Sequence, residues 1–231
     1  VVSFLLDKGV AFQYQDNQGM SPLHFASRQG QRDVVALLLA KGASPVLKNR
    51  AGQTAVDLAV SAGQGGVILL FRDKGLLNPK SETGAMALHA IAASGERDVV
   101  EEFLNSGAVL SAIAPDGKTM VHSAARGGLF ELAERALSSG LDVRAKDKQG
   151  RTALYYAVRG GRKEIVDLLL ASGADPADDE FEGRTLLHMA EDTGETDIVN
   201  ALRSKGTKIK PRPEIPLARP RDSGFTARRG Y

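Results

Sequence analysis

Cysteine and tryptophan are both absent from this 231-residue sequence. Without cysteine, the chain can form no disulfide framework, no thiolate zinc site and no cysteine nucleophile. A cysteine-free chain survives in reducing and oxidising compartments alike, so the absence is compatible with the cytoplasm, which we favour, without establishing it. Without tryptophan, and with aromatic residues at 5%, the core must be built from leucine, valine, isoleucine and alanine. Small aliphatic side chains at that density suit closely packed helices.

Long hydrophobic runs are absent as well. The longest apolar stretches, such as residues 67–71, are far shorter than the roughly 20 residues of a membrane-spanning helix. Hydrophobic residues still make up 42% of the chain, which is ample for a core and too many for a disordered protein. The sequence begins at Val1, without methionine and in what reads as mid-helix, so we expect a piece of a longer protein.

Glycine recurs at a fixed interval. In the first of three series, successive glycines lie 32 or 33 residues apart; a second series follows about eleven residues later, and a third closes the apolar run beyond it. Three phased series do not arise by chance, and they indicate an internal repeat of about 33 residues. The series are Gly19, Gly52, Gly84, Gly117, Gly150 and Gly183; Gly30, Gly63, Gly95, Gly128, Gly161 and Gly194; and Gly42, Gly75, Gly107, Gly140, Gly173 and Gly206.

Each unit contains two short segments with helical periodicity. In the first unit, Leu23 and Ala26 mark one apolar stripe, and residues 34–39 mark the second. Helices of eight to ten residues are too short to persist alone in water, so neighbouring pairs must stack and share one elongated core. The second unit is the expected weak point, because two glycines, Gly65 and Gly66, open its second helix. Serine or threonine stands at the expected N-cap of most first helices: Ser21, Thr54, Thr119, Thr152 and Thr185.

Each unit resembles the ankyrin repeat, whose pattern is Gly-x-Thr-Pro-Leu-His-x-Ala, then Gly, then Val-Val-x-x-Leu-Leu-x-x-Gly-Ala. Residues 19–26 match it closely, whereas Asp57 and Tyr155 replace the histidine and the second repeat is one residue short. The resemblance covers residues 1 to about 208 and implies an all-α solenoid of stacked antiparallel helix pairs joined by β-hairpin loops. The predicted units are a partial repeat at 1–18, repeats at 19–51, 52–83, 84–116, 117–149 and 150–182, a C-terminal repeat at 183–207, and a tail at 208–231.

All four histidines occupy the same slot of their repeats. As zinc ligands, their nitrogens would have to lie about 2 Å from one metal, whereas stacked helices are about 8–10 Å apart. In the family that the chain resembles, this histidine is structural and hydrogen-bonds the backbone of adjoining turns. We therefore expect neither a metal nor another cofactor, and structural roles for His24, His89, His122 and His188.

Motifs of catalysis and nucleotide binding are also missing. The run Gly117-Lys118-Thr119 imitates the end of a phosphate-binding loop, but Ala112 stands where the leading glycine belongs. Carboxylate clusters such as 101–102 and 178–180 are expected to be solvated charge rather than general acid–base pairs. We expect no enzymatic activity, and no catalytic residues.

A basic stripe is predicted along the fourth and fifth repeats. If the resemblance holds, partners contact the hairpin tips and the exposed face of the first helices, which line a concave groove. Basic residues recur in the slots that face this way, although ordinary solubilising charge is the alternative. The candidate protein-binding residues are Arg28, Lys118, Arg126, Lys146, Lys148, Arg151, Arg159 and Arg184.

The final segment differs from the repeats. Residues 208–231 contain four prolines and no helical period, with seven basic and two acidic residues for a net charge of +5. Residues 1–207 carry 23 basic and 26 acidic residues, a net charge of −3. The tail is expected to be flexible or polyproline-like, serving as a ligand-binding arm, a linker or a strap along the groove.

The sequence thus predicts a monomeric, non-catalytic scaffold or targeting module. Its concave face and hairpin tips would bind another protein with an acidic surface or peptide. The alternative is regulatory binding of an acidic polymer or nucleic acid through the stripe and the tail. That alternative is weaker because the repeat body is net acidic and the tail has few aromatic residues to stack on bases. A third hypothesis is the interaction domain of a larger enzyme.

Overall fold

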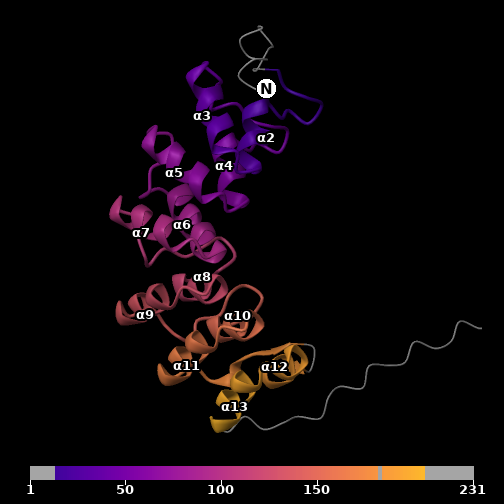
Figure 1. Cartoon of the computed structure of the whole chain (residues 1–231), viewed down its shortest axis with the longest axis vertical. Coiled ribbons are helices and arrows are strands. Elements are labelled where there is room, and N and C mark those ends of the chain that lie inside the picture. Colours follow the sequence, from indigo (N-terminus) through magenta and orange to yellow (C-terminus); the bar gives the residue numbers. More distant parts are fainter. Residues whose placement is uncertain (1–13, 182–183, 206–231) are drawn as a thin grey trace, which may run out of the picture.

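The helices stack in two parallel rows that form one curved column (Figure 1). The computed structural model describes residues 14–181 and 184–205. The predicted arrangement of stacked antiparallel helix pairs is confirmed. The first helices of the repeats are α2 (Pro22–Arg28), α4 (Ala55–Ser61), α6 (Glu82–Ser94), α8 (Met120–Gly127), α10 (Ala153–Arg159) and α12 (Leu186–Thr193). The second helices are α3 (Arg32–Ala40), α5 (Gly65–Asp73), α7 (Arg97–Asn105), α9 (Phe130–Ser138), α11 (Lys163–Ala171) and α13 (Thr196–Ser204).

One continuous core runs the length of the column between the two rows. Aliphatic side chains form most of it, as predicted, and two phenylalanines, Phe71 on α5 and Phe103 on α7, are its largest fully buried members. Each repeat covers the apolar stripe of its neighbour, which explains how helices of seven to thirteen residues persist. Within residues 14–181 and 184–205, no helix combines the length and apolar composition needed to cross a membrane.

The ends of the helices carry residues that stabilise them, the predicted N-caps among them. Thr54 and Thr185 are N-caps whose side chains accept hydrogen bonds from backbone N–H groups three residues later. Asp33 and Asp98 lie in the first turns of α3 and α7, where the helix dipole favours a negative charge. Gly128 ends α8 with a φ of 77°, a left-handed conformation that glycine adopts without steric cost.

The loops predicted as β-hairpins are for the most part hydrogen-bonded turns. In the hairpin before α4, the Asn49 N–H donates to the Gln53 carbonyl at 2.9 Å, and the same bond joins Asp147 to Arg151 before α10. In the described part of the chain, strands pair only between β1 (Glu180–Phe181) and β2 (Arg184–Thr185), which are antiparallel. A short 3₁₀-helix, η1 (Pro176–Asp178), precedes them.

The third repeat departs from the pattern. Gly84 belongs to the glycine series that opens each predicted repeat, but it lies inside α6, which begins at Glu82 after the N-cap Ser81. The one-residue deletion in the preceding repeat leaves too little chain for a hairpin, and a turn in which the Ser81 N–H donates to the Asn78 carbonyl leads directly into the helix. The predicted boundary between residues 83 and 84 therefore falls within α6. The other repeat boundaries stay predictions, and the predicted tail lies outside the described residues.

Gly66→Ala is expected to stabilise the chain by about 0.5–1 kcal/mol, because alanine loses less backbone entropy than glycine in a helix. A Cβ at Gly66 would meet only the Cδ of Arg32, at an ordinary 3.6 Å. Urea unfolding measures the change. Gly42→Ala is the control: that site is open, but its φ of 89° should make the substitution destabilising. A lower urea midpoint for Gly66→Ala would show that the glycine is required there.

Candidate functional site

The first row of helices lies on the inner side of the curved column, with the second row outside (Figure 1). Two neighbouring depressions on the first row share Lys118 and Arg126, and we call them together the groove. Its apolar end, about 440 Å³, is lined by residues of α4 and α6 that include Met86 and Ala90. Its basic end, about 400 Å³, is lined by Lys118, Arg126, Arg151, Tyr156, Arg159 and Gly160.

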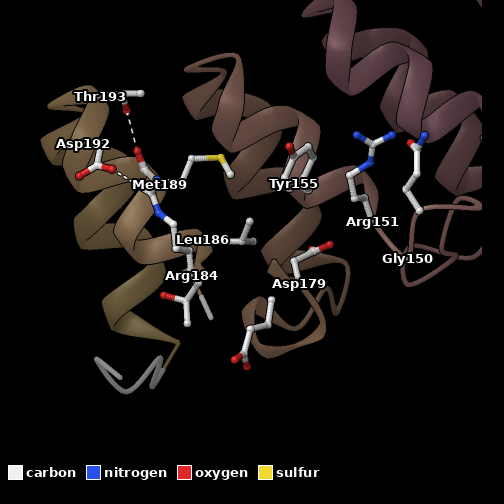
Figure 2. Close-up of a pocket in the computed structure, with 12 residues that line it drawn as sticks. Gly150, Arg151, Tyr155, Asp179, Arg184, Leu186, Met189, Asp192 and Thr193 are labelled. Atoms are coloured by element: carbon white, nitrogen blue, oxygen red, sulfur yellow. Dashed lines mark hydrogen bonds and ion pairs between the residues drawn. The ribbon is translucent and has the colours of Figure 1, made fainter. Parts of the chain in front are cut away.

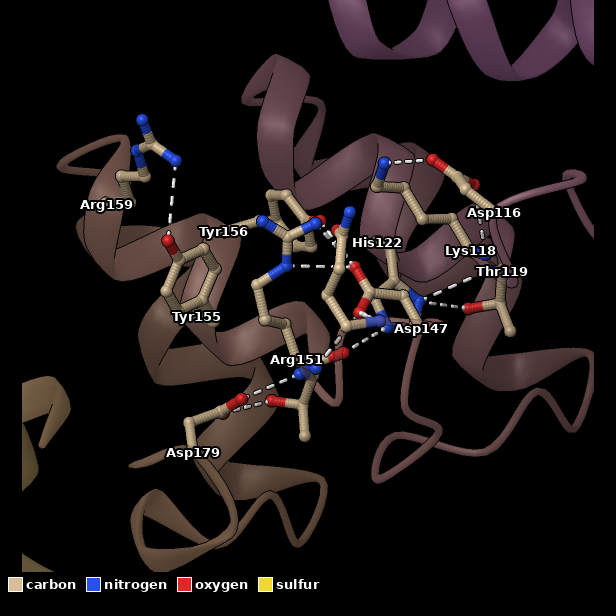
Figure 3. A network of polar contacts seen from close by, with 12 residues as sticks. Asp116, Lys118, Thr119, His122, Asp147, Arg151, Tyr155, Tyr156, Arg159 and Asp179 are labelled. Atoms are coloured by element: carbon tan, nitrogen blue, oxygen red, sulfur yellow. Dashed lines mark hydrogen bonds and ion pairs between the residues drawn. The ribbon is translucent and has the colours of Figure 1, made fainter. Parts of the chain in front are cut away.

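A buried hydrogen-bond network forms the floor of the basic end (Figure 3). The Tyr156 hydroxyl donates to Asp147 Oδ2 at 2.6 Å, and Arg151 Nε donates to the same oxygen at 3.1 Å. Burial raises the pKa of Tyr156, and the carboxylate of Asp147 adds to this effect. Burial opposes ionisation of Asp147, but the hydrogen bonds from Tyr156, Arg151 and Gln149 outweigh it and lower the pKa of Asp147. The ionised carboxylate therefore fixes both the ring and the guanidinium.

Two cations lie over the ring of Tyr156. Arg151 Cζ is 5.0 Å and Lys118 Nζ is 5.4 Å from the ring centroid, which is within cation–π range. Both cations also have carboxylate partners, since Lys118 forms an ion pair with Asp116 and Arg151 forms one with Asp147. Lys118 and Arg151 are thus held in place, with little of their side-chain surface exposed.

Arg126 and Arg159 complete the basic end, and they differ from the other two cations. They occupy equivalent positions in the last turns of α8 and α10, and both are exposed. In the part of the chain that the structure describes, neither forms an ion pair. Among the described residues, the side chain of Arg159 forms a hydrogen bond only with the Tyr155 hydroxyl, at 3.4 Å (Figure 3). These two guanidiniums are therefore available to an anionic ligand.

The other predicted binding residues lie outside the groove. Lys146 Nζ donates to the Asp178 carbonyl at 2.8 Å, and Lys148, although exposed, does not line the basic end. Arg28 lies on α2, with its guanidinium 5.5 Å from the Phe25 ring centroid. The structure therefore brings together four of the eight candidates: Lys118, Arg126, Arg151 and Arg159.

Arg184, the last candidate, belongs to a separate pocket of about 290 Å³ between α10 and α12, the C-terminal pocket (Figure 2). There it forms an ion pair with Asp192. Tyr155, Leu186 and Met189 give this pocket an apolar wall, and it adjoins the basic end because Arg151 lines both. It offers a second place for an apolar side chain beside the cations.

The four histidines make hydrogen bonds within the fold. In His122, Nδ1 accepts from the Thr119 N–H at 3.1 Å, so the ring proton belongs on Nε2, which lies 3.1 Å from the Arg151 carbonyl of the next hairpin. His24 bridges to Gln53 in the same way. Burial lowers the pKa of His122 and of His89, in keeping with neutral rings. Their structural role stays a prediction that this geometry supports.

In the two repeats without the histidine, another side chain accepts the hydrogen bond from the backbone N–H of the N-cap threonine. Asp57 accepts from the Thr54 N–H at 2.9 Å, so a local carboxylate replaces the ring. Tyr155 cannot do this. Instead Asp179, from the following hairpin, accepts from the N–H and the hydroxyl of Thr152 at 2.7 and 2.5 Å (Figure 3). The interpretation of residues 178–180 as solvated charge was therefore wrong for Asp179, whose residue surface is only 5% exposed.

Asp179→Ala is expected to destabilise the chain by about 2 kcal/mol, because it leaves two buried donors of Thr152 without partners. Asp179→Asn should cost less, since its carbonyl can still accept from the backbone N–H. Burial raises the pKa of Asp179, so its contribution to stability is greatest below about pH 4 and declines as pH rises through the native-state value.

Urea unfolding between pH 3 and pH 7 measures both effects. Wild type should gain stability relative to Asp179→Asn as pH falls, because only wild type carries the titrating carboxyl. An Asp179→Ala variant as stable as wild type at pH 7 would contradict the capping role.

Tyr156 and Asp147 are the residues of the basic end that sequence reasoning missed. A tyrosine and a hairpin aspartate belong to no motif, so the sequence alone does not mark either of them as a binding residue. The available signal was the adjacent pair Tyr155-Tyr156 in a chain with only four tyrosines, next to the basic slots. The structure shows why they matter: Tyr156 orients two of the four cations.

Comparison with known proteins agrees with this architecture. A family model described as ankyrin repeats (3 copies) matches residues 1–77, 58–147 and 122–212. Among solved structures, the crystal structure of the human ASB11 ankyrin repeat domain is similar, with a TM-score of 0.64 and 21% sequence identity. The match covers 90% of this chain and 93% of that chain. A search of curated proteins gives no match. The chain belongs to the ankyrin repeat family.

Proposed function

We propose that this chain is a non-catalytic interaction module that binds an acidic segment of another protein along the groove. Ankyrin repeats generally mediate protein–protein interaction. The observation that supports this particular ligand is the convergence of four cations on the basic end, where Arg126 and Arg159 lack acidic partners within the described residues. The partner's carboxylates would supply the missing counter-charges.

Charge alone does not give useful affinity. An exposed ion pair contributes about 0–1 kcal/mol, so two or three such contacts amount to millimolar or weaker binding. The apolar end supplies the other component, since Met86 is 36% exposed there and alanines of α6 line the wall beside it. Methionine adapts its shape to different apolar partners. A segment with apolar residues next to its acidic residues would therefore use the whole groove.

Nucleic acid is less well supported as the ligand. Two of the four cations, Lys118 and Arg151, are already neutralised by Asp116 and Asp147, so too few cations remain to neutralise the successive phosphates of a nucleic acid along the groove. A uniformly charged duplex also offers no apolar group to contact the apolar end. Catalysis also lacks support, because all four histidines are engaged in contacts within the fold.

Selection from an unbiased peptide display library tests the proposal. The intact chain should enrich peptides that combine acidic and apolar residues. The affinity of these peptides should fall as the salt concentration rises from about 0.05 M to about 0.5 M, because salt screens the attraction between charges. A duplex DNA competitor should not displace them. Enrichment of peptides without acidic residues, or displacement by DNA, would contradict the acidic-segment proposal.

A further inference from the structure

The charge of the basic end exceeds what one carboxylate can neutralise. Lys118 and Arg151 are balanced by Asp116 and Asp147, which leaves the two charges of Arg126 and Arg159. A carboxylate carries a single negative charge, whereas a phosphomonoester carries about −1.5 to −2 at neutral pH and presents three acceptor oxygens. The residual charge of +2 therefore matches a phosphomonoester.

The donors are also of the right kind. Arg126 and Arg159 come from equivalent positions on neighbouring first helices, which lie roughly 10 Å apart, so their long side chains can converge on one group. A guanidinium binds a phosphoryl group through two parallel N–H donors, which a lysine cannot do. Lys118, whose charge is balanced by Asp116, is held beside them by this ion pair and by Tyr156. Little ordering would be needed when the anion binds.

We propose that the basic end recognises a phosphorylated serine or threonine within the partner segment. The proposal rests on the function proposed above and narrows its ligand. The depression of about 400 Å³ has room for the phosphorylated side chain. Because the apolar end adjoins it through Lys118 and Arg126, and the C-terminal pocket adjoins it through Arg151, apolar residues should flank the phosphorylated residue.

A protein ligand fits the surroundings better than a membrane or a nucleic acid. The basic end includes Arg126 and Arg159, from the last turns of α8 and α10. These two helices belong to the row on the inner side of the curved column (Figure 1), where an extended chain has easier access than a flat bilayer. The adjoining apolar end calls for side chains beside the phosphate. A phosphoinositide headgroup shares the phosphomonoester chemistry and serves as an arm of the test.

Three oriented peptide libraries test the inference with the intact chain. They share the same degenerate flanking positions and carry serine, glutamate or phosphoserine at the fixed centre. Fluorescence anisotropy of each library, and sequencing of the bound fraction, report affinity and flanking preference. The phosphoserine library should bind at least about ten-fold more tightly than the glutamate library, with apolar residues enriched at the flanking positions.

Two double variants separate charge from geometry. Arg126→Lys/Arg159→Lys keeps the charge but loses the paired donors, so the preference for phosphoserine over glutamate should fall to about two-fold or less. Arg32→Lys/Lys74→Arg, on the second-helix side, should leave the preference unchanged. Equal binding of the phosphoserine and glutamate libraries would overturn the inference while leaving the acidic-segment function intact.

Two further outcomes also overturn the inference. One is a phosphoserine preference that survives in Arg126→Lys/Arg159→Lys, because the guanidiniums would then not be the donors. The other is binding to vesicles that contain a phosphoinositide with no binding to any library, because the ligand would then be a lipid. If neither the libraries nor the display peptides bind, the proposed function itself fails.

Discussion

Replacing both Arg126 and Arg159 by glutamate should weaken binding of the selected acidic peptides by about 100-fold. Each reversal turns an attraction into a repulsion, and the two sites lie close enough for their fields to add, since the Debye length is about 10 Å at 0.1 M salt. The loss should appear partly in the association rate, because the remaining cations are already paired with Asp116 and Asp147. Isothermal titration and stopped-flow fluorescence measure the two quantities.

Arg32→Glu/Lys74→Glu is the matched control. It changes the net charge of the chain by the same amount, but both residues are exposed on the second-helix side, away from the groove. Its affinity for the peptides should stay within about two-fold of wild type, apart from the general effect of net charge. If the two double variants bind alike, only net charge matters, and the basic residues of the groove are ordinary solubilising charge.

Gly127→Ala should destabilise the chain by about 3 kcal/mol, although alanine is the better helix former by about 1 kcal/mol. The reason is the close approach of α8 to α6, because a Cβ at Gly127 would lie 1.9 Å from the carbonyl oxygen of Ala92. A backbone carbonyl in a helix cannot move aside as the end of a flexible side chain can. The two helices would have to separate, which would open the core at their contact. Chemical denaturation measures the loss.

Gly160→Ala, one repeat later in the same slot, is the comparison. Its Cβ would meet nothing closer than 3.2 Å, and its φ is negative, so the cost should be below about 1 kcal/mol. The slot holds Gln29, Ala62, Ser94 and Thr193 in other repeats, so the repeat pattern itself does not require glycine. Equal stability losses in the two variants would show that the α6–α8 approach is not the cause.

The regular part of the fold was predictable because the same local sequence signals recur in each repeat. Glycine spacing, N-cap residues such as Thr54 and apolar stripes all point to one structure, and consistency of this kind is what a repeat sequence provides. The exceptions depend on what a neighbouring repeat does. Gly84 keeps its slot in the sequence, yet it becomes helical because one residue is missing upstream.

The candidate site was predictable only in part, for a similar reason. Slot equivalence identified Arg126 and Arg159, which the structure places on neighbouring helices around one depression. It could not show that Lys118 and Arg151 are neutralised by nearby carboxylates, because those ion pairs depend on side-chain geometry. It also assigned Asp179 to solvent, because its partner, Thr152, lies 27 residues earlier in the chain. A contact between residues so far apart in the sequence leaves no local pattern.

The location of a bound ligand tests the central claim most directly. An acidic peptide selected by the intact chain would carry a nitroxide spin label at one end, and backbone amide resonances would be recorded with the label oxidised and reduced. We predict the strongest paramagnetic broadening in the hairpins at 114–118 and 147–151 and in the last turns of α8 and α10, with weaker broadening in α9 and α11. Broadening confined to the second helices would contradict the account, because the ligand would then lie on the face opposite the groove.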